Sequence, residues 1–253
     1  MITTPLSEQD TTLLDRAVAL AQKGLFTTKP NPRVGCVIAR EGKIIGEGWH
    51  VRAGQVHAEI AALIAADHDV RGADVFVSLE PCSHHGKTGP CATALIDAGV
   101  ARVVISMLDP NPEVSGRGVE MLRQAGIQVL ISDNPEQARM INSGFCLRME
   151  KGRPLVRLKI AATLDGRTAA SDGSSQWITG DSARKDVHTL RAMSCALITG
   201  IGTIRADNPR LNARVDSDVE QPLRVVVEGR HVVPPDAAIF NEAGRVLLVG
   251  SRS

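Results

Sequence analysis

The chain has 253 residues, of which 43% are hydrophobic and 23% are charged, and its formal net charge is +1. This length is enough for two domains that each bury a hydrophobic core. The 29 basic residues face 28 acidic ones without forming a basic run, and four Phe, two Trp and no Tyr leave few rings for stacking on bases. The composition therefore argues against a nucleic-acid-binding protein.

The N-terminus and the cysteine content indicate an intracellular protein. Ser7-Glu8-Gln9-Asp10 is polar and acidic and lacks the layout of a signal peptide, and no apolar run approaches the roughly 18 residues of a membrane span. Five cysteines, an odd number, argue against a disulfide framework. We therefore expect a cytoplasmic protein that does not interact with membranes.

The first half of the chain alternates between helical and strand patterns. Ser7 and Asp10 resemble a capping box before an apolar helical stripe that ends near Gly24. After the turn at residues 29–33, the patterns predict a hairpin of strands 34–39 and 43–48, a helix after His57, strand 74–79, helix 91–98, strand 102–107, helix 118–125, strand 127–131 and helix 135–149. Such alternation indicates a largely parallel sheet with helices on both faces, in which the first two strands are the antiparallel exception.

The pattern restarts after Lys151-Gly152-Arg153-Pro154, which ends the preceding helix and marks a domain boundary. We therefore expect one domain at residues 1–150 and a second at 151–253. The second domain is predicted to contain strand 155–162, helix 181–193 and strands 195–199, 225–228 and 246–249. Gly200-Ile201-Gly202 resembles the opening of a dinucleotide-binding loop but lacks the third glycine, so by itself it is a weak indication.

The residues from His57 to Cys91 carry the main functional signal. His57, Cys82 and Cys91 form the ligand set that a catalytic zinc takes when its fourth position is left for water, and Glu59 need not touch the metal. His57 and Cys91 each stand at the start of a predicted helix, where free N–H groups and the helix dipole favour thiolates. His-x-Glu followed by Pro-Cys-x-x-Cys marks zinc deaminases of nucleobases, although eight residues separate the two cysteines here.

Several plainer interpretations stand beside this one. A His-Ala-Glu tripeptide is most often a helix start with a solvated glutamate, and two cysteines can simply be buried thiols. A zinc that only stabilises the fold would need a fourth protein ligand, which His84 or His85 could supply. The order of the residues and the strand between the two halves favour the catalytic zinc.

Polar residues in the adjoining loops are candidates for substrate contacts. The Asn31 amide could read a ring carbonyl or a ribose hydroxyl, although an Asn between prolines ordinarily stabilises a turn. His84, His85 and Lys87 lie between the two cysteines and suit an anionic substrate, with loop solvation as the alternative. For Asp109 and Asn111, which follow a parallel strand, the spacing favours a proline turn over a substrate contact.

The chain resembles the bifunctional riboflavin-biosynthesis deaminase/reductase family from about residue 15 to residue 214. The most specific stretches are Pro30-Asn31-Pro32-Arg33-Val34-Gly35-Cys36-Val37, Gly54-Gln55-Val56-His57-Ala58-Glu59, residues 79–91, Asp109-Pro110-Asn111-Pro112, Leu164-Asp165-Gly166-Arg167 and Gln176-Trp177-Ile178-Thr179. The long cysteine spacing is normal for this family. The resemblance implies an α/β protein in which a cytidine-deaminase-like three-layer α/β/α domain with a mixed sheet precedes a dihydrofolate-reductase-like domain.

The resemblance also implies two consecutive reactions and a homodimer. The first domain would use zinc to remove the 2-amino group of 2,5-diamino-6-ribosylamino-4(3H)-pyrimidinone 5′-phosphate by hydrolysis. The second would reduce the ribosyl group to ribityl with NADPH. In the first reaction, His57, Cys82 and Cys91 would hold the zinc while Glu59 carries protons.

Residue roles in the second reaction rest on the resemblance alone. Contacts to NADPH are expected from Ala161, Trp177, Thr203 and Asp207. Contacts to substrate are expected from Ser175, Arg191, Leu211 and Arg214, with the two arginines binding its phosphate. Without the resemblance, Trp177 would be assigned to the core and Arg191 to a solvated helix face.

The chain departs from the family in two places. It has Gly89-Pro90 where relatives commonly carry two prolines, which loosens the loop without changing the ligands. The resemblance stops at Ser253, whereas the family continues for roughly a third of a domain with a glycine-rich cofactor segment, so we expect a C-terminally incomplete reductase domain with exposed apolar sheet edges. The competing hypotheses are a deaminase with a non-functional reductase remnant, a deaminase of tRNA or nucleosides, and a non-catalytic zinc module.

Overall fold

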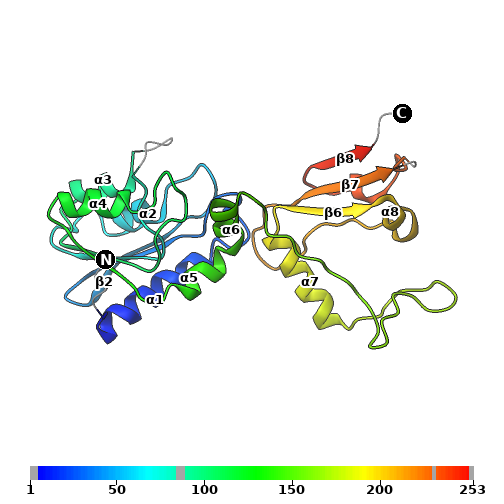
Figure 1. Cartoon of the computed structure of the whole chain (residues 1–253), viewed down its shortest axis with the longest axis horizontal. Coiled ribbons are helices and arrows are strands. Elements are labelled where there is room, and N and C mark those ends of the chain that lie inside the picture. The colour runs from blue at the N-terminus through cyan, green and yellow to red at the C-terminus, as the bar shows by residue number, and fades with distance from the viewer. Residues whose placement is uncertain (1–4, 84–88, 230–231, 251–253) are drawn as a thin grey trace. The chain divides into compact units, whose positions relative to one another are not determined.

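The computed structural model describes residues 5–83, 89–229 and 232–250. The chain divides into two compact units, Met1–Leu155 and Val156–Ser253 (Figure 1). The proposed substrate residues His84, His85 and Lys87 lie outside the described residues. Within the described residues, no helix combines the length and the apolar character that crossing a membrane requires.

A five-stranded mixed sheet forms the centre of the first unit. Its order is β2-β1-β3-β4-β5, with the strands spanning Gly35–Arg40 (β1), Lys43–Trp49 (β2), Asp74–Val77 (β3), Arg102–Ile105 (β4) and Gln128–Ile131 (β5). β1 pairs antiparallel with β2 and with β3, while β3, β4 and β5 are mutually parallel. The predicted strands, their parallel arrangement and the antiparallel hairpin are confirmed, although all three parallel strands are shorter than expected.

Helices cover both faces of this sheet, so the three-layer α/β/α arrangement is confirmed. One face packs against α2 (Ala58–Ala65), α3 (Cys91–Asp97) and α4 (Arg117–Gln124) through the alternate strand residues Cys36, Ile38, Val75, Val77, Val103 and Ile105. The other face packs against α1 (Glu8–Gln22) through Val37, Ala39, Phe76 and Val104. This division follows from the strand period of two, which sends successive side chains to opposite faces.

Glycines let two helices lie directly on the strands. A Cβ at Gly48 in β2 would lie 2.4 Å from the Ala62 nitrogen of α2. A Cβ at Gly35 in β1 would lie 2.1 Å from the Ala17 carbonyl oxygen of α1. Since both distances are far below van der Waals contact, these positions exclude any side chain, and the close packing fixes the height of α2 above the sheet.

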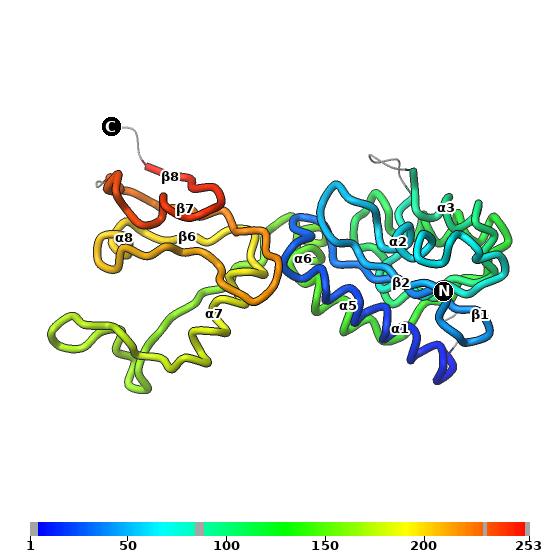
Figure 2. Tube along the Cα trace, turned by 180° about the vertical axis from the view of Figure 1, so that it is seen from behind, coloured from blue at the N-terminus to red at the C-terminus, as the bar shows by residue number. Residues whose placement is uncertain are grey.

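The helix predicted over residues 135–149 is divided in two. α5 (Glu136–Ile141) lies beside α1 in both views of the chain, and α6 (Ser143–Lys151) follows it (Figures 1 and 2). The division falls at buried Asn142, whose Oδ1 accepts from the Arg33 backbone nitrogen at 2.8 Å and whose Nδ2 donates to the Arg33 oxygen at 2.9 Å. The prediction of one helix was wrong because this amide bonds to a distant backbone segment.

The second unit contains a parallel three-stranded sheet of order β6-β7-β8. Its strands are Ala196–Gly200 (β6), Leu223–Gly229 (β7) and Val246–Gly250 (β8), and its helices are α7 (Asp181–Met193), α8 (Ile201–Asp207) and the 3₁₀ helix η1 (Ala238–Asn241). Ile204 of α8, Val226 of β7 and Ile239 of η1 meet in a small buried core. Both strands predicted at 225–228 and 246–249 are present.

The strand predicted over residues 155–162 is wrong. These residues are not assigned to a strand, and Val156, Leu158 and Ile160 are 78%, 84% and 65% exposed. Their apolar alternation suits a sheet, but a strand also needs a neighbouring strand that accepts its hydrogen bonds. Within the described chain, β6, β7 and β8 pair with one another and not with this segment.

An ion-pair network joins α1 to the sheet. Arg102 of β4 donates to the Asp10 carboxylate of α1 at 2.7 and 3.0 Å and to Asp74 of β3 at 2.7 Å. Burial raises the pKa of Asp10, but hydrogen bonds from Arg102 and Ser7 and the Arg102 charge outweigh it, so the pKa lies below its usual value. The network therefore stabilises the contact between α1 and the sheet most when Asp10 is ionised.

We expect Asp10→Asn to lower the free energy of unfolding at pH 7 by about 1–3 kcal/mol, because a hydrogen-bonded carboxylate is lost. The folded pKa lies below the unfolded value near 3.9, so the contribution is complete above about pH 5 and disappears as the pH falls through the folded pKa. Urea titrations at pH 7 and at decreasing pH, with chelator present throughout, measure this. Asp69→Asn, at an exposed partner of Arg40, is the control. An Asp10→Asn penalty that stays constant down to pH 2 contradicts the assignment.

Candidate metal centre and active site

Three potential metal ligands converge beside the sheet of the first unit. His57 immediately precedes α2, Cys82 follows β3 and Cys91 is the first residue of α3. The His57 Nδ1 atom lies 3.2 Å from the Cys91 sulfur and 3.6 Å from the Cys82 sulfur, and the three ligand atoms lie within 4.8 Å of one another. Over the described ranges this is the single cluster of His, Cys, Asp or Glu that could hold a metal ion.

Helix N-termini position two of these ligands. The His57 carbonyl accepts from Ala61, so His57 occupies the capping position of α2. The backbone nitrogens of Cys91 and Ala92, at the start of α3, donate to the Cys82 sulfur at 3.3 Å and to the Cys82 oxygen at 3.2 Å. Hydrogen bonds from Cys91 and then from His57 lower the pKa of the Cys82 thiol despite its burial. The cluster is therefore arranged for thiolate ligation.

The donor set fits zinc. One imidazole nitrogen and two sulfurs are the borderline and soft ligands that this ion binds. Among the described residues no fourth His, Cys, Asp or Glu joins the cluster, and His84 and His85 lie outside them. Three ligands match a catalytic site, in which a further coordination position serves water or substrate.

Glu59 lies in the first turn of α2 and is 3% exposed. Burial, and then the negative charge of Cys82, raise the pKa of its carboxyl to about 7. The carboxyl also forms a hydrogen bond with the Cys91 thiol, which places it beside the metal ligands. A carboxyl with this pKa can both accept and donate a proton near neutral pH.

Asn31 is linked to the cluster by a residue that the sequence analysis missed, His50. The Asn31 Nδ2 lies 3.0 Å from the His50 Nε2, and the His50 Nδ1 lies 3.0 Å from the Val56 oxygen. One neutral tautomer satisfies both contacts, with Nδ1 donating to the carbonyl and Nε2 accepting from the amide. The His50 and His57 rings meet edge to face at 5.4 Å. The available signal was a histidine directly after strand β2, four residues before Gly54 of the following turn.

The Asp109 and Asn111 side chains form a turn, as the spacing favoured. The Asp109 Oδ1 accepts from the Asn111 nitrogen at 2.8 Å, and the Asn111 Oδ1 accepts from the Glu113 nitrogen at 3.1 Å. Both bonds reach two residues ahead, which is the Asx-turn pattern. These two acceptors therefore shape the loop between β4 and α4.

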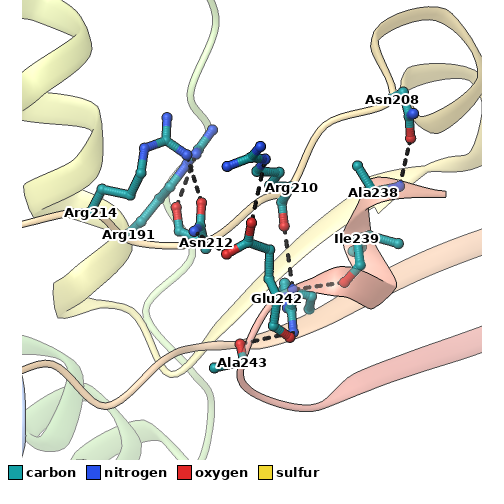
Figure 3. Close-up of polar contacts among 10 residues, drawn as sticks. Arg191, Asn208, Arg210, Asn212, Arg214, Ala238, Ile239, Glu242 and Ala243 are labelled. Carbon is teal, nitrogen blue, oxygen red and sulfur yellow. Dashed lines mark hydrogen bonds and ion pairs between the residues drawn. The ribbon is translucent and has the colours of Figure 1, made fainter.

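In the second unit, Asn212 brings Arg191 and Arg214 together (Figure 3). Arg191 of α7 donates to the Asn212 carbonyl oxygen at 3.2 Å, and Arg214 donates to the Asn212 Oδ1 at 2.6 Å. Burial, and then the Arg214 charge, lower the pKa of Arg191. Leu211 lies next to Asn212 and has a positive φ of 52°. Two clustered guanidinium groups are typical of an anion site.

A second arginine network holds the far side of Asn212. The Asn212 Nδ2 donates to Glu242 at 2.8 Å, and Glu242 also pairs with Arg210 at 3.3 Å. Buried Arg224 of β7 donates to the carbonyl oxygens of Ile239, Glu242, Ala243 and Gly244 at 2.8–3.0 Å. Asn212, Glu242 and Arg224 were not singled out from the sequence, because nothing in their spacing relates them.

The residues expected to contact NADPH lie on two segments. Thr203 and Asp207 are exposed and one turn apart on α8. Ala161 and Trp177, together with the expected substrate residue Ser175, belong to the irregular segment 156–180 that precedes α7 (Figure 2). Trp177 is 69% exposed and its ring contacts the Arg184 guanidinium at 4.4 Å, so it is not a core residue.

Comparisons with known proteins account for both units. Residues 7–107 match the cytidine and deoxycytidylate deaminase zinc-binding region, and residues 154–253 match the RibD C-terminal domain. The riboflavin biosynthesis protein RibD of Haemophilus influenzae is 47% identical over 97% of this chain and 69% of its own length. RibD of Escherichia coli is 49% identical over 93% of this chain and 68% of its own.

Solved structures give the same result. A structure of Acinetobacter baumannii RibD matches 97% of this chain and 70% of its own, with a TM-score of 0.92 and 47% identity. The diaminohydroxyphosphoribosylaminopyrimidine deaminase/5-amino-6-(5-phosphoribosylamino)uracil reductase of Thermotoga maritima matches 96% of this chain and 70% of its own, with a TM-score of 0.89 and 41% identity. The chain therefore belongs to the RibD family of riboflavin-biosynthesis enzymes and carries its zinc-binding deaminase domain and its reductase domain.

Proposed function

We propose that the first unit hydrolytically deaminates 2,5-diamino-6-ribosylamino-4(3H)-pyrimidinone 5′-phosphate and that the second reduces the resulting ribosyl compound to its ribityl form with NADPH. The observation that carries the proposal is the convergence of His57, Cys82 and Cys91 beside the buried Glu59. Family membership supports the substrate, since the T. maritima relative is named for these two activities.

His57 and the two cysteines would hold the zinc through Nδ1 and both Sγ atoms. The bound ion supplies a Lewis acid that lowers the pKa of a water molecule toward neutrality. The helix N-termini at His57 and Cys91 support this by stabilising the negative charge of the ligands. The chain's own contribution is thus a set of three ligand atoms that already lie within 4.8 Å of one another in the fold.

Glu59 would move the protons of the deamination. Its carboxylate would take one proton from the attacking water and pass it to the ring nitrogen. It would then take the second proton from the hydroxyl added to the ring and deliver it to the leaving amine, so that one water is consumed and one ammonia is released. The pKa near 7 suits both directions of transfer. Burial keeps bulk water away from the carboxyl, which limits proton exchange with solvent.

Asn31 would hydrogen-bond the pyrimidinone ring or the ribose, with its amide oriented by His50. His84 and Lys87, on the loop between the cysteines, would contact the anionic part of the same substrate. These assignments rest on residue chemistry and, for Asn31, on its connection to the metal cluster through His50. A small phosphorylated pyrimidine is consistent with the scarcity of stacking aromatics.

In the reductase, Arg191 and Arg214 would bind the substrate phosphate, and Ser175 and Leu211 would contact the remainder of that substrate. Contacts to NADPH would come from Ala161, Trp177, Thr203 and Asp207. The two guanidinium groups that Asn212 holds together support the phosphate site. We further propose that residues 1–150 and 151–253 act as two domains of a cytoplasmic homodimer.

The competing functions are not favoured. A deaminase of tRNA or nucleosides would account for the first unit alone, whereas the RibD relatives match 93–97% of the chain at 47–49% identity. A zinc ion that only stabilises the fold leaves the buried Glu59 beside the ligands without a role.

We expect the protein to bind about one zinc ion per chain and Cys91→Ser to lose most of it during dialysis, because a neutral hydroxyl replaces a thiolate ligand. Metal analysis after dialysis measures the zinc content. The matched control is Cys195→Ser, since Cys195 is an exposed cysteine outside the cluster. Equal zinc contents in Cys91→Ser and the unchanged protein contradict the ligand assignment.

Glu59→Gln should retain zinc and lower the rate of deamination by roughly 10²–10⁴-fold, the usual contribution of a general acid–base group. Ammonia release from the pyrimidinone phosphate measures the rate, and cytidine and adenosine serve as alternative substrates. Glu47→Gln, at a carboxylate paired with Arg16, is the control. A zinc-loaded Glu59→Gln protein with full activity refutes the role, and a preference for cytidine or adenosine refutes the substrate.

Arg214→Gln should raise the KM of the reductase for its phosphorylated substrate by about 10–100-fold, the effect of losing 1.5–3 kcal/mol of charged hydrogen bonding. NADPH affinity should not change. NADPH oxidation at varied substrate concentration gives KM, and fluorescence titration gives the cofactor affinity. The exposed Arg245 provides the control variant Arg245→Gln. An unchanged KM, or a loss confined to NADPH binding, argues against the phosphate site.

A further inference from the structure

Glu80 is a buried carboxylate two residues before Cys82 that the proposed chemistry does not use. It is 3% exposed and lies in the segment that leaves the carboxyl end of β3. Its two oxygens accept four backbone hydrogen bonds, from the nitrogens of Asp109 at 3.1 Å, Gly116 at 3.0 Å, Gly118 at 3.0 Å and Val119 at 3.2 Å. No water is needed to satisfy this charge, because backbone donors surround it.

The four donors come from one place in the fold, the β4–α4 loop and the first turn of α4. Gly116 precedes α4, and Gly118 and Val119 lie in its first turn. The N-terminal N–H groups of a helix ordinarily find a capping side chain in the preceding residue, but Gly116 has none. Glu80 replaces that cap from another part of the chain and places its negative charge at the positive end of the helix dipole.

The backbone around Glu80 is held as closely as its side chain. The Glu80 nitrogen donates to the Met107 oxygen at 3.0 Å, which ties the segment to the end of β4. A Cβ at Gly118 would lie 2.1 Å from the Pro81 oxygen, so the first turn of α4 packs directly onto the residue between Glu80 and Cys82. Because the φ of proline is fixed, Pro81 adds little conformational freedom between Glu80 and Cys82.

Cys82 is thus held from two sides. The N-terminus of α3 contacts its sulfur and carbonyl oxygen, and the N-terminus of α4 holds Glu80 and Pro81. We infer that Glu80 is a positioning residue for Cys82, which it holds at the distance from His57 and Cys91 that metal binding requires. This inference rests on the proposed zinc site and extends it to a carboxylate that touches neither metal nor substrate.

The alternative is that Glu80 stabilises only the fold, as any helix cap does. The two roles predict different metal affinities for variants whose metal-free forms are equally stable. Loss of a partner that orients a metal ligand typically costs about 10–100-fold in metal affinity. A cap that acts only on the fold lowers the stability of the metal-free protein without changing the geometry of the ligands.

The test compares four variants of the full chain. Glu80→Gln keeps the shape but turns an amide N–H₂ toward backbone donors. Gly118→Ala leaves the charge intact and pushes on the Pro81 oxygen, so it tests the same contact if Glu80→Gln does not fold. Glu120→Gln changes an exposed carboxylate in the same helix turn, and Leu122→Ala weakens the packing of α4 from its buried face.

Zinc affinity is measured by competition with a chromophoric chelator, ligand geometry by the visible absorption of the Co²⁺-loaded protein, and stability by urea unfolding without metal. We expect Glu80→Gln and Gly118→Ala to weaken zinc binding by about 10–100-fold and to shift the Co²⁺ bands. Glu120→Gln and Leu122→Ala should keep both the affinity and the spectrum, even where Leu122→Ala lowers stability.

The outcomes separate this inference from the proposed function. Wild-type zinc affinity and Co²⁺ bands in Glu80→Gln or, if that variant does not fold, in Gly118→Ala overturn the positioning role and leave the zinc site standing. The same holds if Leu122→Ala, at a matched loss of stability, weakens zinc binding equally. If the unchanged protein binds no zinc, the proposed function fails together with the inference.

Discussion

Two helices begin at one point beside the sheet of the first unit, and their dipoles make that point favourable for negative charge. α2 begins after His57, α3 begins at Cys91, and the segment after β3 brings Cys82 between them. Three ligand atoms therefore lie within 4.8 Å of one another on a rigid support. Burial in the same packing arrangement raises the pKa of Glu59, so this carboxyl and the three ligand atoms depend on the same packing.

In the second unit, backbone and side-chain contacts bring two positively charged side chains together. Arg191 and Arg214 come from a helix and a loop, and the backbone and side chain of Asn212 hold them together. Arg224 in the central strand then fixes the segment 239–244, from which Glu242 reaches Asn212. The backbone and side-chain oxygens of Asn212 thereby offset part of the repulsion between the two neighbouring guanidinium groups.

Local patterns predicted the elements of the first unit and its metal ligands, because the strand period and the His-x-Glu and Cys spacing are visible within short windows. Contacts between distant segments were missed. Asn142 divides a helix because its side-chain amide bonds to the backbone of Arg33, 109 positions earlier in the chain. Glu80 caps a helix that begins 37 residues later. The alternation at 155–162 predicted a strand, yet alternation describes only side chains, and pairing depends on a partner strand. His50 was overlooked because a single histidine carries no spacing.

The double hydrogen bond between Asn142 and the Arg33 backbone sets how far the deaminase unit extends. Arg33 adjoins the loop of Asn31, and Arg33 also donates to the Ile141 carbonyl at 3.0 Å. The last sheet strand ends at Ile131, so a fragment trimmed there would keep every metal ligand and lose the amide that clamps this loop. A fragment that keeps the metal ligands together with this clamp therefore has to extend at least through Asn142, eleven residues beyond the end of the last strand of this sheet.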